Sequence, residues 1–348
     1  MFLKNAWYVG CTPDEIDGKP LGRRICGEKV AFFRGPENKV AAVEDFCPHR
    51  GAALSLGFVQ DGNLVCGYHG LAMGADGKAA SMPMQRVAGF PANKTFPVVE
   101  RYGFIWIWPG DPELADESLI PHLEWADNPD WAYGGGMYHL NCDYRLMIDN
   151  LMDLTHETYV HPESIGHHAI DKVPVNTVVQ GDSIVTSRYM SNIVAPPFFQ
   201  LQLRYNGMPA DEPMDRWQIS RFTPPANILI DVGVAFAGKG GFEAAREDKI
   251  GTIVVDFMTP ETETSHWYFW GMARNWKPDD AEITEIIRQG QGKIFHQDLA
   301  VLEAQQKNLS EYPGRHLLML NIDAGGVQSR RVLERLVKKE NLADIETA

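Results

Sequence analysis

Two short segments in the first quarter of the chain each combine one cysteine with one histidine. They are Cys47-Pro48-His49 and Cys66-Gly67-Tyr68-His69. In a Rieske [2Fe–2S] cluster, two thiolates hold one iron and two neutral imidazoles hold the other, which raises the reduction potential. The two segments supply that ligand set, one thiolate and one imidazole each. The pattern therefore predicts a Rieske cluster bound by Cys47, His49, Cys66 and His69, and electron transfer as a first function.

Zinc is the alternative occupant of four such residues. Zinc sites of this size usually keep the two cysteines together and the two histidines together, whereas here each segment has one of each. Glycines such as Gly51, Gly67 and Gly70 leave the backbone free to aim N–H groups at sulfur, as iron–sulfur loops do. The spacing therefore favours the iron–sulfur cluster over zinc.

A second set of candidate metal ligands lies in the segment Asn150–Pro162, which contains His156 and His161. Two histidines and one carboxylate form the facial triad of non-haem Fe(II) oxygenases, which leaves coordination positions open. An unbroken helix would separate two residues that are five apart. Because proline disfavours helical geometry at the residue before it, we expect the helix to end at Pro162 and His161 to turn back beside His156.

The third ligand must come from elsewhere in the chain, and a helical pattern near the C-terminus offers Asp298. The spacing places Asp298 on one helix face with Ile294, Val301 and Leu302. A buried carboxylate without a partner is costly, and a metal ion removes that cost. We therefore expect Asp298 to complete the triad; the alternative is a carboxylate at the margin of the helix, paired with a nearby lysine or arginine.

The elements that position these ligands fall into two groups. Up to about residue 110, short apolar segments alternate with turn residues, as in small antiparallel β domains. An acidic, proline-containing connection then leads to a helical pattern near Asp143 to Tyr159, strands between Asp182 and Arg274, and a long helical pattern from Ala281 to Leu309. Grouped strands with flanking helices predict an α+β fold. We expect a small all-β domain with the cluster over residues 1–118, and a larger α+β catalytic domain with an antiparallel sheet and the mononuclear iron over residues 119–348.

Composition narrows the class of protein. The chain has 348 residues, 44% of them hydrophobic, which suffices for two cores. A net charge of −14 disfavours nucleic acid and anionic membranes as partners. No apolar run approaches the roughly 18 residues of a membrane span, and no signal-peptide pattern is present. Three further cysteines, Cys11, Cys26 and Cys142, are expected to be buried small hydrophobes in a reducing compartment. We therefore expect a cytoplasmic enzyme.

The two motifs together carry a resemblance. The two Cys/His segments followed by Asp153-x-x-His156-x4-His161 resemble the Rieske non-haem iron oxygenase family over essentially the whole chain. Three segments are similar to the vanillate-demethylating members of that family: Asn5–Val9, Asp149–His161 and Asn321–Arg331. The resemblance implies an aromatic monooxygenase that uses O2 and two kinds of iron, a Rieske [2Fe–2S] cluster and mononuclear Fe(II). Its implied reaction is O-demethylation of vanillate to protocatechuate and formaldehyde.

The resemblance also implies partners and residue roles. Family members form rings, so we expect a homotrimer. Their electrons come from NADH through a separate reductase with flavin and a [2Fe–2S] cluster, and this chain has no nicotinamide or flavin fingerprint of its own. Asp153 would connect His156 to the second cluster histidine, His69, of an adjacent subunit. Asn150, one helical turn before Asp153, would support the iron ligands.

Substrate contacts are expected on two of the predicted strands, Trp217–Phe222 and His266–Gly271. A pocket for a small aromatic acid needs apolar walls and a few polar groups. Strand alternation places Tyr268 and Trp270 on one face, and we predict that they line the pocket with Gln218. Arg221 has two open roles, pairing with the substrate carboxylate or forming a surface ion pair.

Two alternative functions remain at this point. The same machinery would serve another methoxybenzoate or the methyl group of another arene. A Rieske electron carrier without a catalytic iron is the second alternative, and the Asp153–His161 segment argues against it.

Overall fold

The computed structural model describes residues 1–347 and divides the chain into two compact units. The first unit contains Met1–His122 together with the short segment Thr259–Thr262, and the second contains Leu123–Met258 and the residues from Glu263 onward. The composition of Thr259–Thr262 does not differ from that of the neighbouring sequence, so the sequence does not indicate that this segment belongs to the first unit. Its backbone nevertheless bonds to the first unit, since the carbonyl of Pro260 accepts from the N–H of Cys26 at 2.7 Å.

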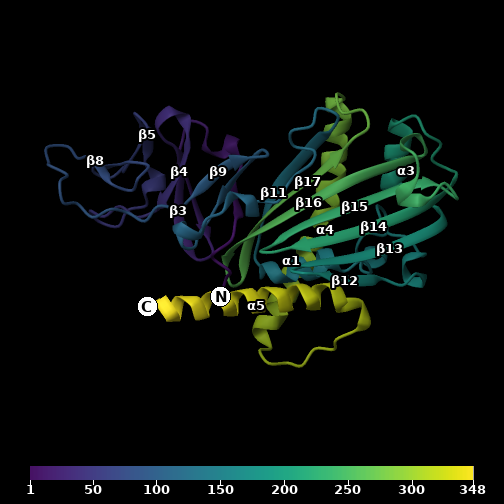
Figure 1. Cartoon of the computed structure of the whole chain (residues 1–348). Helices are drawn as coiled ribbons and strands as arrows, with labels where there is room; N and C mark the ends of the chain where they lie inside the picture. The colour runs from purple at the N-terminus through teal and green to yellow at the C-terminus, as the bar shows by residue number, and fades with distance from the viewer. Residues whose placement is uncertain (348) are drawn as a thin grey trace. The chain divides into compact units, whose positions relative to one another are not determined.

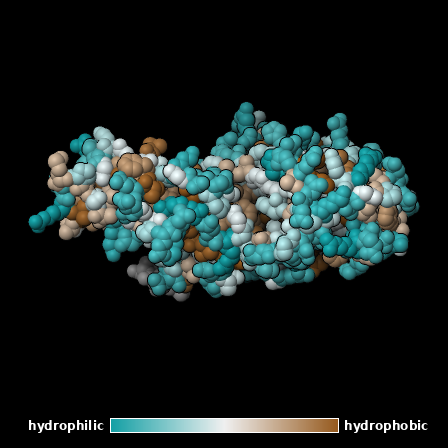
Figure 2. Space-filling view, turned by 90° about the horizontal axis from the view of Figure 1, so that it is seen from above, coloured by the Kyte–Doolittle hydropathy of each residue, from teal (hydrophilic) through white to brown (hydrophobic). Residues whose placement is uncertain are grey.

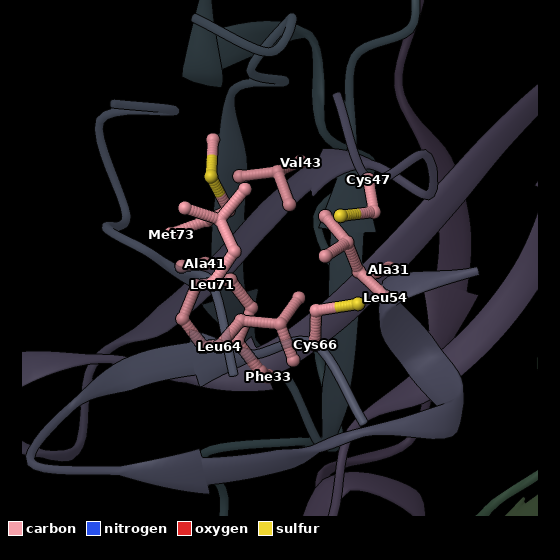
Figure 3. Packing of buried hydrophobic residues seen from close by; sticks show 10 residues of the cluster. All are labelled: Ala31, Phe33, Ala41, Val43, Cys47, Leu54, Leu64, Cys66, Leu71 and Met73. Carbon is pink, nitrogen blue, oxygen red and sulfur yellow. The ribbon is translucent and has the colours of Figure 1, made fainter. Parts of the chain in front are cut away.

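The first unit is built from small antiparallel sheets. In the described residues these have the strand orders β1-β10-β9, β2-β3-β4 and β5-β6-β7-β8. A buried cluster that includes Phe33, Val43, Leu54 and Leu64 packs between the second and third sheets, and Figure 3 shows Cys47 and Cys66 at one side of it. The strands are β1 (Tyr8–Cys11), β2 (Leu21–Ile25), β3 (Glu28–Arg34), β4 (Val40–Glu44), β5 (Phe58–Gln60), β6 (Asn63–Val65), β7 (Ala72–Met73), β8 (Ala79–Ser81), β9 (Val98–Arg101) and β10 (Phe104–Ile107).

The second unit is a large antiparallel sheet with helices packed on it. Within the described residues the sheet has seven strands in the order β11-β17-β16-β15-β14-β13-β12. Helix α4 packs against β11 and β17, and α1 packs against β14 (Figure 1). The elements are β11 (Ala132–Leu140), α1 (Tyr144–Met152), α2 (Glu157–Val160), β12 (Asn176–Gln180), β13 (Ser183–Val194), α3 (Pro197–Tyr205), β14 (Pro213–Thr223), β15 (Asn227–Phe236), β16 (Lys249–Thr262), β17 (Ser265–Arg274), α4 (Ala281–Glu311) and α5 (Ala324–Thr347).

Strand alternation gives this sheet two distinct faces. Register pairs Arg188 with Gln218, Gln218 with Val232, and Val232 with Thr252. These four residues therefore lie side by side across β13, β14, β15 and β16, on one face of the sheet. The same face carries even-numbered neighbours such as Val254, and it is the face on which the site described below is built.

The predicted fold class is confirmed: a small β unit precedes a larger α+β unit with an antiparallel sheet and flanking helices. One helix differs from the prediction. The pattern near Asp143 to Tyr159 is two helices, because α1 ends at Asp153, whose φ of −91° and ψ of 116° are extended. The short helix α2 begins after His156. Asp153 accepts hydrogen bonds from the backbone and side chain of Thr155, which turn the chain between the two helices.

The surface is mostly polar. Figure 2 shows hydrophilic side chains over most of the visible face, with small hydrophobic patches between them. Within residues 1–347, none of the helices has both the length and the apolar character that crossing a membrane requires. The cysteines Cys11, Cys26 and Cys142 are buried, as expected.

Candidate metal centres

The two Cys/His segments form loops with the same internal hydrogen bonds. In the first loop the N–H of Cys47 donates to the carbonyl of Ala52 at 2.7 Å, and the N–H of Gly51 donates back to the carbonyl of Cys47 at 2.8 Å. The second loop repeats this pattern from Cys66 to Leu71, with Gly70 in place of Gly51. Both glycines have positive φ, 70° and 77°, a conformation that glycine adopts without strain. Each loop thus holds its cysteine and histidine in an equivalent position.

The four side chains of these loops meet. The Cys47 and Cys66 thiols are buried, whereas the rings of His49 and His69 lie toward solvent, with ring centroids 4.6 Å apart. Burial raises the pKa of the Cys47 thiol, and the adjacent Cys66 raises it further. Two adjacent thiols favour an occupant that binds them as thiolates. A buried sulfur pair beside an outward imidazole pair fits a Rieske [2Fe–2S] cluster.

The second centre combines residues from three places in the second unit. His156 immediately precedes α2, His161 immediately follows it, and Asp298 lies on α4. One ligand atom from each of the three residues lies within 4.8 Å of the others. The Nε2 atoms of His156 and His161 are 3.6 Å and 3.2 Å from Oδ1 of Asp298. The structure therefore brings the three predicted iron ligands together around one point.

The chemistry of this donor set fits a divalent cation. Burial would lower the pKa of His156, but the carboxylates of Asp153 and Asp298 outweigh burial and raise it. Asp298 itself is 3% exposed. Among the side chains that line the adjoining cavity, the one arginine or lysine in the described residues is Arg216, which is paired with Glu157. A metal ion would therefore compensate Asp298, and two imidazoles with one carboxylate suit iron.

Neighbouring side chains orient these ligands. Nδ1 of His161 lies 2.8 Å from Oε1 of Gln297. Since an amide oxygen only accepts, the proton sits on Nδ1 and leaves Nε2 free for a metal. The side-chain amide of Asn150 donates to Oδ1 of Asp298 at 3.0 Å. On the far side of His156, its Nδ1 lies 3.6 Å from Oδ2 of Asp153. Asn150 thus contacts Asp298, and Asp153 approaches His156.

An apolar cavity adjoins the triad. Its walls come from α1, α2, α3, α4 and the even-numbered face of the sheet. The lining includes apolar residues from the helices, the strands and the loops that flank α2: Leu154, Ile165, Phe198, Phe199, Ile230, Val232, Val254, Met272, Ile294 and Phe295. Such walls beside a metal site suit a small aromatic molecule.

Comparison with known proteins matches both parts of the chain in which these centres lie. Residues 6–97 match the model of the Rieske [2Fe-2S] domain, and residues 140–339 match the model of the vanillate O-demethylase oxygenase C-terminal domain. The chain belongs to the Rieske oxygenases. Its cofactors are accordingly a Rieske [2Fe–2S] cluster and a mononuclear non-haem iron. Because the catalytic-domain model covers more than half of the chain, the match argues against an electron carrier that lacks a catalytic domain.

Individual relatives extend the match to the full length. The vanillate O-demethylase oxygenase subunit of Pseudomonas sp. strain HR199 is 68% identical, over 99% of this chain and 97% of the relative. The oxygenase component of dicamba O-demethylase from Stenotrophomonas maltophilia is 36% identical, over 97% of this chain and 99% of the relative. The crystal structure of dicamba monooxygenase bound to 3,6-dichlorosalicylic acid has a TM-score of 0.90 at 35% identity and covers 98% of this chain and 99% of that chain.

The three predicted substrate contacts of this Rieske oxygenase do not line the cavity beside the triad. Tyr268 and Trp270 share the expected face, but Phe295 of α4 packs against both rings, with centroids 5.3 Å and 5.7 Å away. Phe295 itself lines the cavity, so Tyr268 and Trp270 contact a residue of the cavity wall and do not line the cavity themselves. Gln218 is buried and donates to Glu157. Alternation predicted the face correctly, but it carries no information on which helix residue covers that face.

Several polar residues of the site were not predicted from the sequence. Gln297, Glu157 and Arg216 were not among the candidates, and Arg221, considered for a substrate carboxylate, instead donates to Gln180 at the surface. A signal for Arg216 exists in the sequence: it occupies the same strand face as Ser220, next to apolar positions of the neighbouring strands. Gln297 has no such signal, because its contact with His161 joins residues far apart in the chain.

Proposed function

We propose that this chain is the oxygenase component of a two-component monooxygenase that O-demethylates vanillate to protocatechuate and formaldehyde. The observation that carries the proposal is the 68% identity, over nearly the whole chain, to a vanillate O-demethylase oxygenase subunit. The buried His156, His161 and Asp298 beside an apolar cavity support it. The balanced reaction consumes vanillate, O2, NADH and a proton, and yields protocatechuate, formaldehyde, NAD and water.

The proposed site residues have different roles. Cys47, His49, Cys66 and His69 would hold the cluster, and His156, His161 and Asp298 the mononuclear iron. When bound, the two groups supply single electrons and the activation of O2 for hydroxylation of the methoxy carbon. The apolar walls hold the aromatic ring near the triad and limit the access of water. The hydroxylated methoxy group is a hemiacetal, which collapses to the phenol and formaldehyde once its O–H proton is removed.

The proposal includes partners for this component. An NADH-dependent reductase with flavin and a [2Fe–2S] cluster would supply electrons, in keeping with relatives whose names describe one component of a monooxygenase system. We propose a homotrimer located in the cytoplasm, in which Asp153 links His156 to the cluster histidine His69 of an adjacent subunit. The position of Asp153 supports this role, because one of its oxygens binds Thr155 and the other faces His156.

A second candidate is the same chemistry on another methoxybenzoate or on an arene methyl group. It is favoured by relatives at 36% identity over nearly the full chain that are named dicamba O-demethylase and toluene-4-sulfonate monooxygenase. Both candidates use the same two metal centres. Product analysis separates them.

A single-turnover experiment tests the proposal without the reductase. The purified protein is reduced chemically, the reductant is removed, and vanillate and O2 are added. We expect protocatechuate and formaldehyde in equal amounts, approaching one of each per active site. Reoxidation of the cluster without either product would refute vanillate as the substrate, and the same assay with other methoxybenzoates and methylarenes would then identify the second candidate.

A further inference from the structure

Two buried arginines lie on neighbouring strands of the sheet that forms one wall of the cavity beside the triad. Arg188 on β13 and Arg216 on β14 are 1% and 2% exposed. They lie on the same face of the sheet and are diagonal neighbours, because Arg188 pairs with Gln218 and Arg216 pairs with Met190. Arg216 lines the cavity, and its guanidinium also stacks over Phe199 at 5.3 Å. Buried guanidiniums are rare unless an anion pairs with them.

The charges around these two arginines do not balance. Of the two arginines, Glu157 contacts Arg216. Its carboxylate accepts a hydrogen bond from Arg216 at 2.8 Å and another from the side-chain amide of Gln218. Arg188 has a single hydrogen bond in the described residues, from Nη1 to the carbonyl of Ile170 at 2.9 Å. Two other carboxylates face it at longer range, Asp153 and the exposed Asp171. One cation of the pair therefore lacks a contacting anion.

Several polar atoms here have no partner among the described residues. They are Nε and Nη2 of Arg188, Nε of Arg216 and Oε1 of Gln218, all buried on one face of the sheet. Buried polar atoms without partners cost free energy, so such a concentration points to a polar ligand group or to bound water. Burial lowers the pKa of Arg188, as expected for a cation that its neighbours do not fully compensate.

The cavity therefore changes character along the sheet. Its walls on β15, β16 and β17 are apolar, with Ile230, Val254 and Met272, whereas its end on β14 is cationic. An aromatic ring that carries a carboxylate has the same two parts. A buried guanidinium recognises a carboxylate through charge-assisted hydrogen bonds.

We propose that Arg216, reinforced by the charge of Arg188 behind it, receives the carboxylate of the substrate and so selects aromatic acids over neutral arenes. The proposal rests on the function proposed above. It assigns a specificity role to two residues, and it makes Glu157 the residue that sets how much positive charge remains for the substrate.

Binding affinity, measured without turnover, tests this assignment. The dissociation constants of vanillate and of vanillyl alcohol, in which a neutral CH2OH replaces the carboxylate, are measured anaerobically by calorimetry on the intact protein. The ratio of the two constants reports acid selectivity. In Arg188→Met the Glu157–Arg216 pair stays intact. The summed charge of residue 188, Arg216 and Glu157 then falls to zero. We expect the preference for the acid to fall about tenfold to a hundredfold, with vanillyl alcohol affected less than about twofold.

Three more variants test this interpretation. Arg188→Lys keeps the charge and is expected to retain most of the preference. Glu157→Gln removes the competing anion and is expected to shift the preference the opposite way, further toward the acid. Arg221→Met is the matched control, because Arg221 lies on the same strand as Arg216 but is exposed and bonds to Gln180; its ratio should not change. If Arg188→Met does not fold, Glu157→Gln still decides the sign of the effect.

Other outcomes overturn the inference and leave the proposed function distinguishable from it. If vanillate and vanillyl alcohol lose affinity equally in Arg188→Met, or if Glu157→Gln leaves the ratio unchanged, the cationic end holds bound water rather than the carboxylate. Wild-type protein that demethylates vanillate in single turnover would then keep its proposed function without this selectivity. Conversely, wild-type protein that prefers benzoates over the corresponding alcohols but releases no formaldehyde from vanillate would keep the selectivity and lose the proposed substrate.

Discussion

The hydrogen bond from Asn150 to Asp298 offers a direct test of how the proposed iron ligands are held. The amide nitrogen of Asn150 donates to Oδ1 of Asp298 at 3.0 Å, and this same oxygen is the one nearest to the two histidines. We expect Asn150→Ala to let the carboxylate rotate away from the metal position. Hydrogen bonds to charged groups contribute about 1.5–3 kcal/mol, and each 1.4 kcal/mol changes an equilibrium constant tenfold. The predicted loss of Fe(II) affinity is therefore about tenfold to a hundredfold, the usual range for residues that orient metal ligands.

A chelator competition measures this affinity anaerobically. Absorbance of the Rieske cluster serves as an internal standard and should not change, because the cluster ligands lie in the first unit. The chain contains a matched control in Asn141, whose side-chain amide also donates to a carboxylate on α4, that of Glu303, at 3.0 Å. That bond is exposed, so Asn141→Ala should change Fe(II) affinity less than about twofold. Equal effects in the two variants, or no effect of Asn150→Ala, would refute the positioning role.

Three further predictions follow from contacts within the second unit. Asp153→Asn should leave both metal centres loaded, as iron analysis and cluster absorbance will show, and largely abolish product formation per O2 consumed. A near-normal ratio of product to O2 would contradict the proposed role of Asp153 in electron transfer between the two centres. Burial raises the pKa of Asp256 to about 8 from 3.8, so the folded state keeps a proton that the unfolded state loses, and stability falls as the pH rises between these values. Asp256→Asn, which can still accept from Tyr268, should therefore gain up to about 1.4 kcal/mol over the wild type per pH unit across that range; a gain in unfolding free energy that does not vary with pH would contradict this. Gly325→Ala should destabilise the protein by about 1–3 kcal/mol in denaturant titration, because its Cβ would lie 2.5 Å from Oγ1 of Thr186; unchanged stability would show that α5 shifts freely.

The parts of the site that the sequence predicted are those that local patterns encode. The cluster loops are self-contained, since the backbone bonds that shape each loop join Cys47 to Ala52 and Cys66 to Leu71. Asp298 was predicted because a carboxylate on an apolar helix face is informative wherever that helix packs. Even there one detail was wrong: Val301, placed on the same face, is exposed. Helical periodicity determines the angle around the helix only approximately at the edge of the buried face.

The polar end of the cavity was not predicted, for a physical reason. The ion pair between Glu157 and Arg216 joins α2 to β14, and Arg188 reaches the same place through strand register. Alternation shows that Arg216 and Gln218 share a face, but not whether that face is buried or which helix covers it. That information depends on the tertiary packing of segments far apart in the sequence, which a single sequence does not reveal.

The third segment that carried the family resemblance, Asn321–Arg331, contributes no metal ligand, and its packing explains what it does. It contains the start of α5, which lies against α1 (Figure 1). Gly325 and Gly326 permit this close approach, since a Cβ on Gly326 would lie 2.7 Å from Oδ1 of Asp149. Arg330 then donates to the Asp149 carboxylate from Nε, which is 2.9 Å from both oxygens, and from Nη2, which is 2.5 Å from Oδ2. Because Asp149 directly precedes Asn150, α5 contacts the helix turn that bonds to Asp298. We infer that the segment supports the proposed iron site by holding α1 in place.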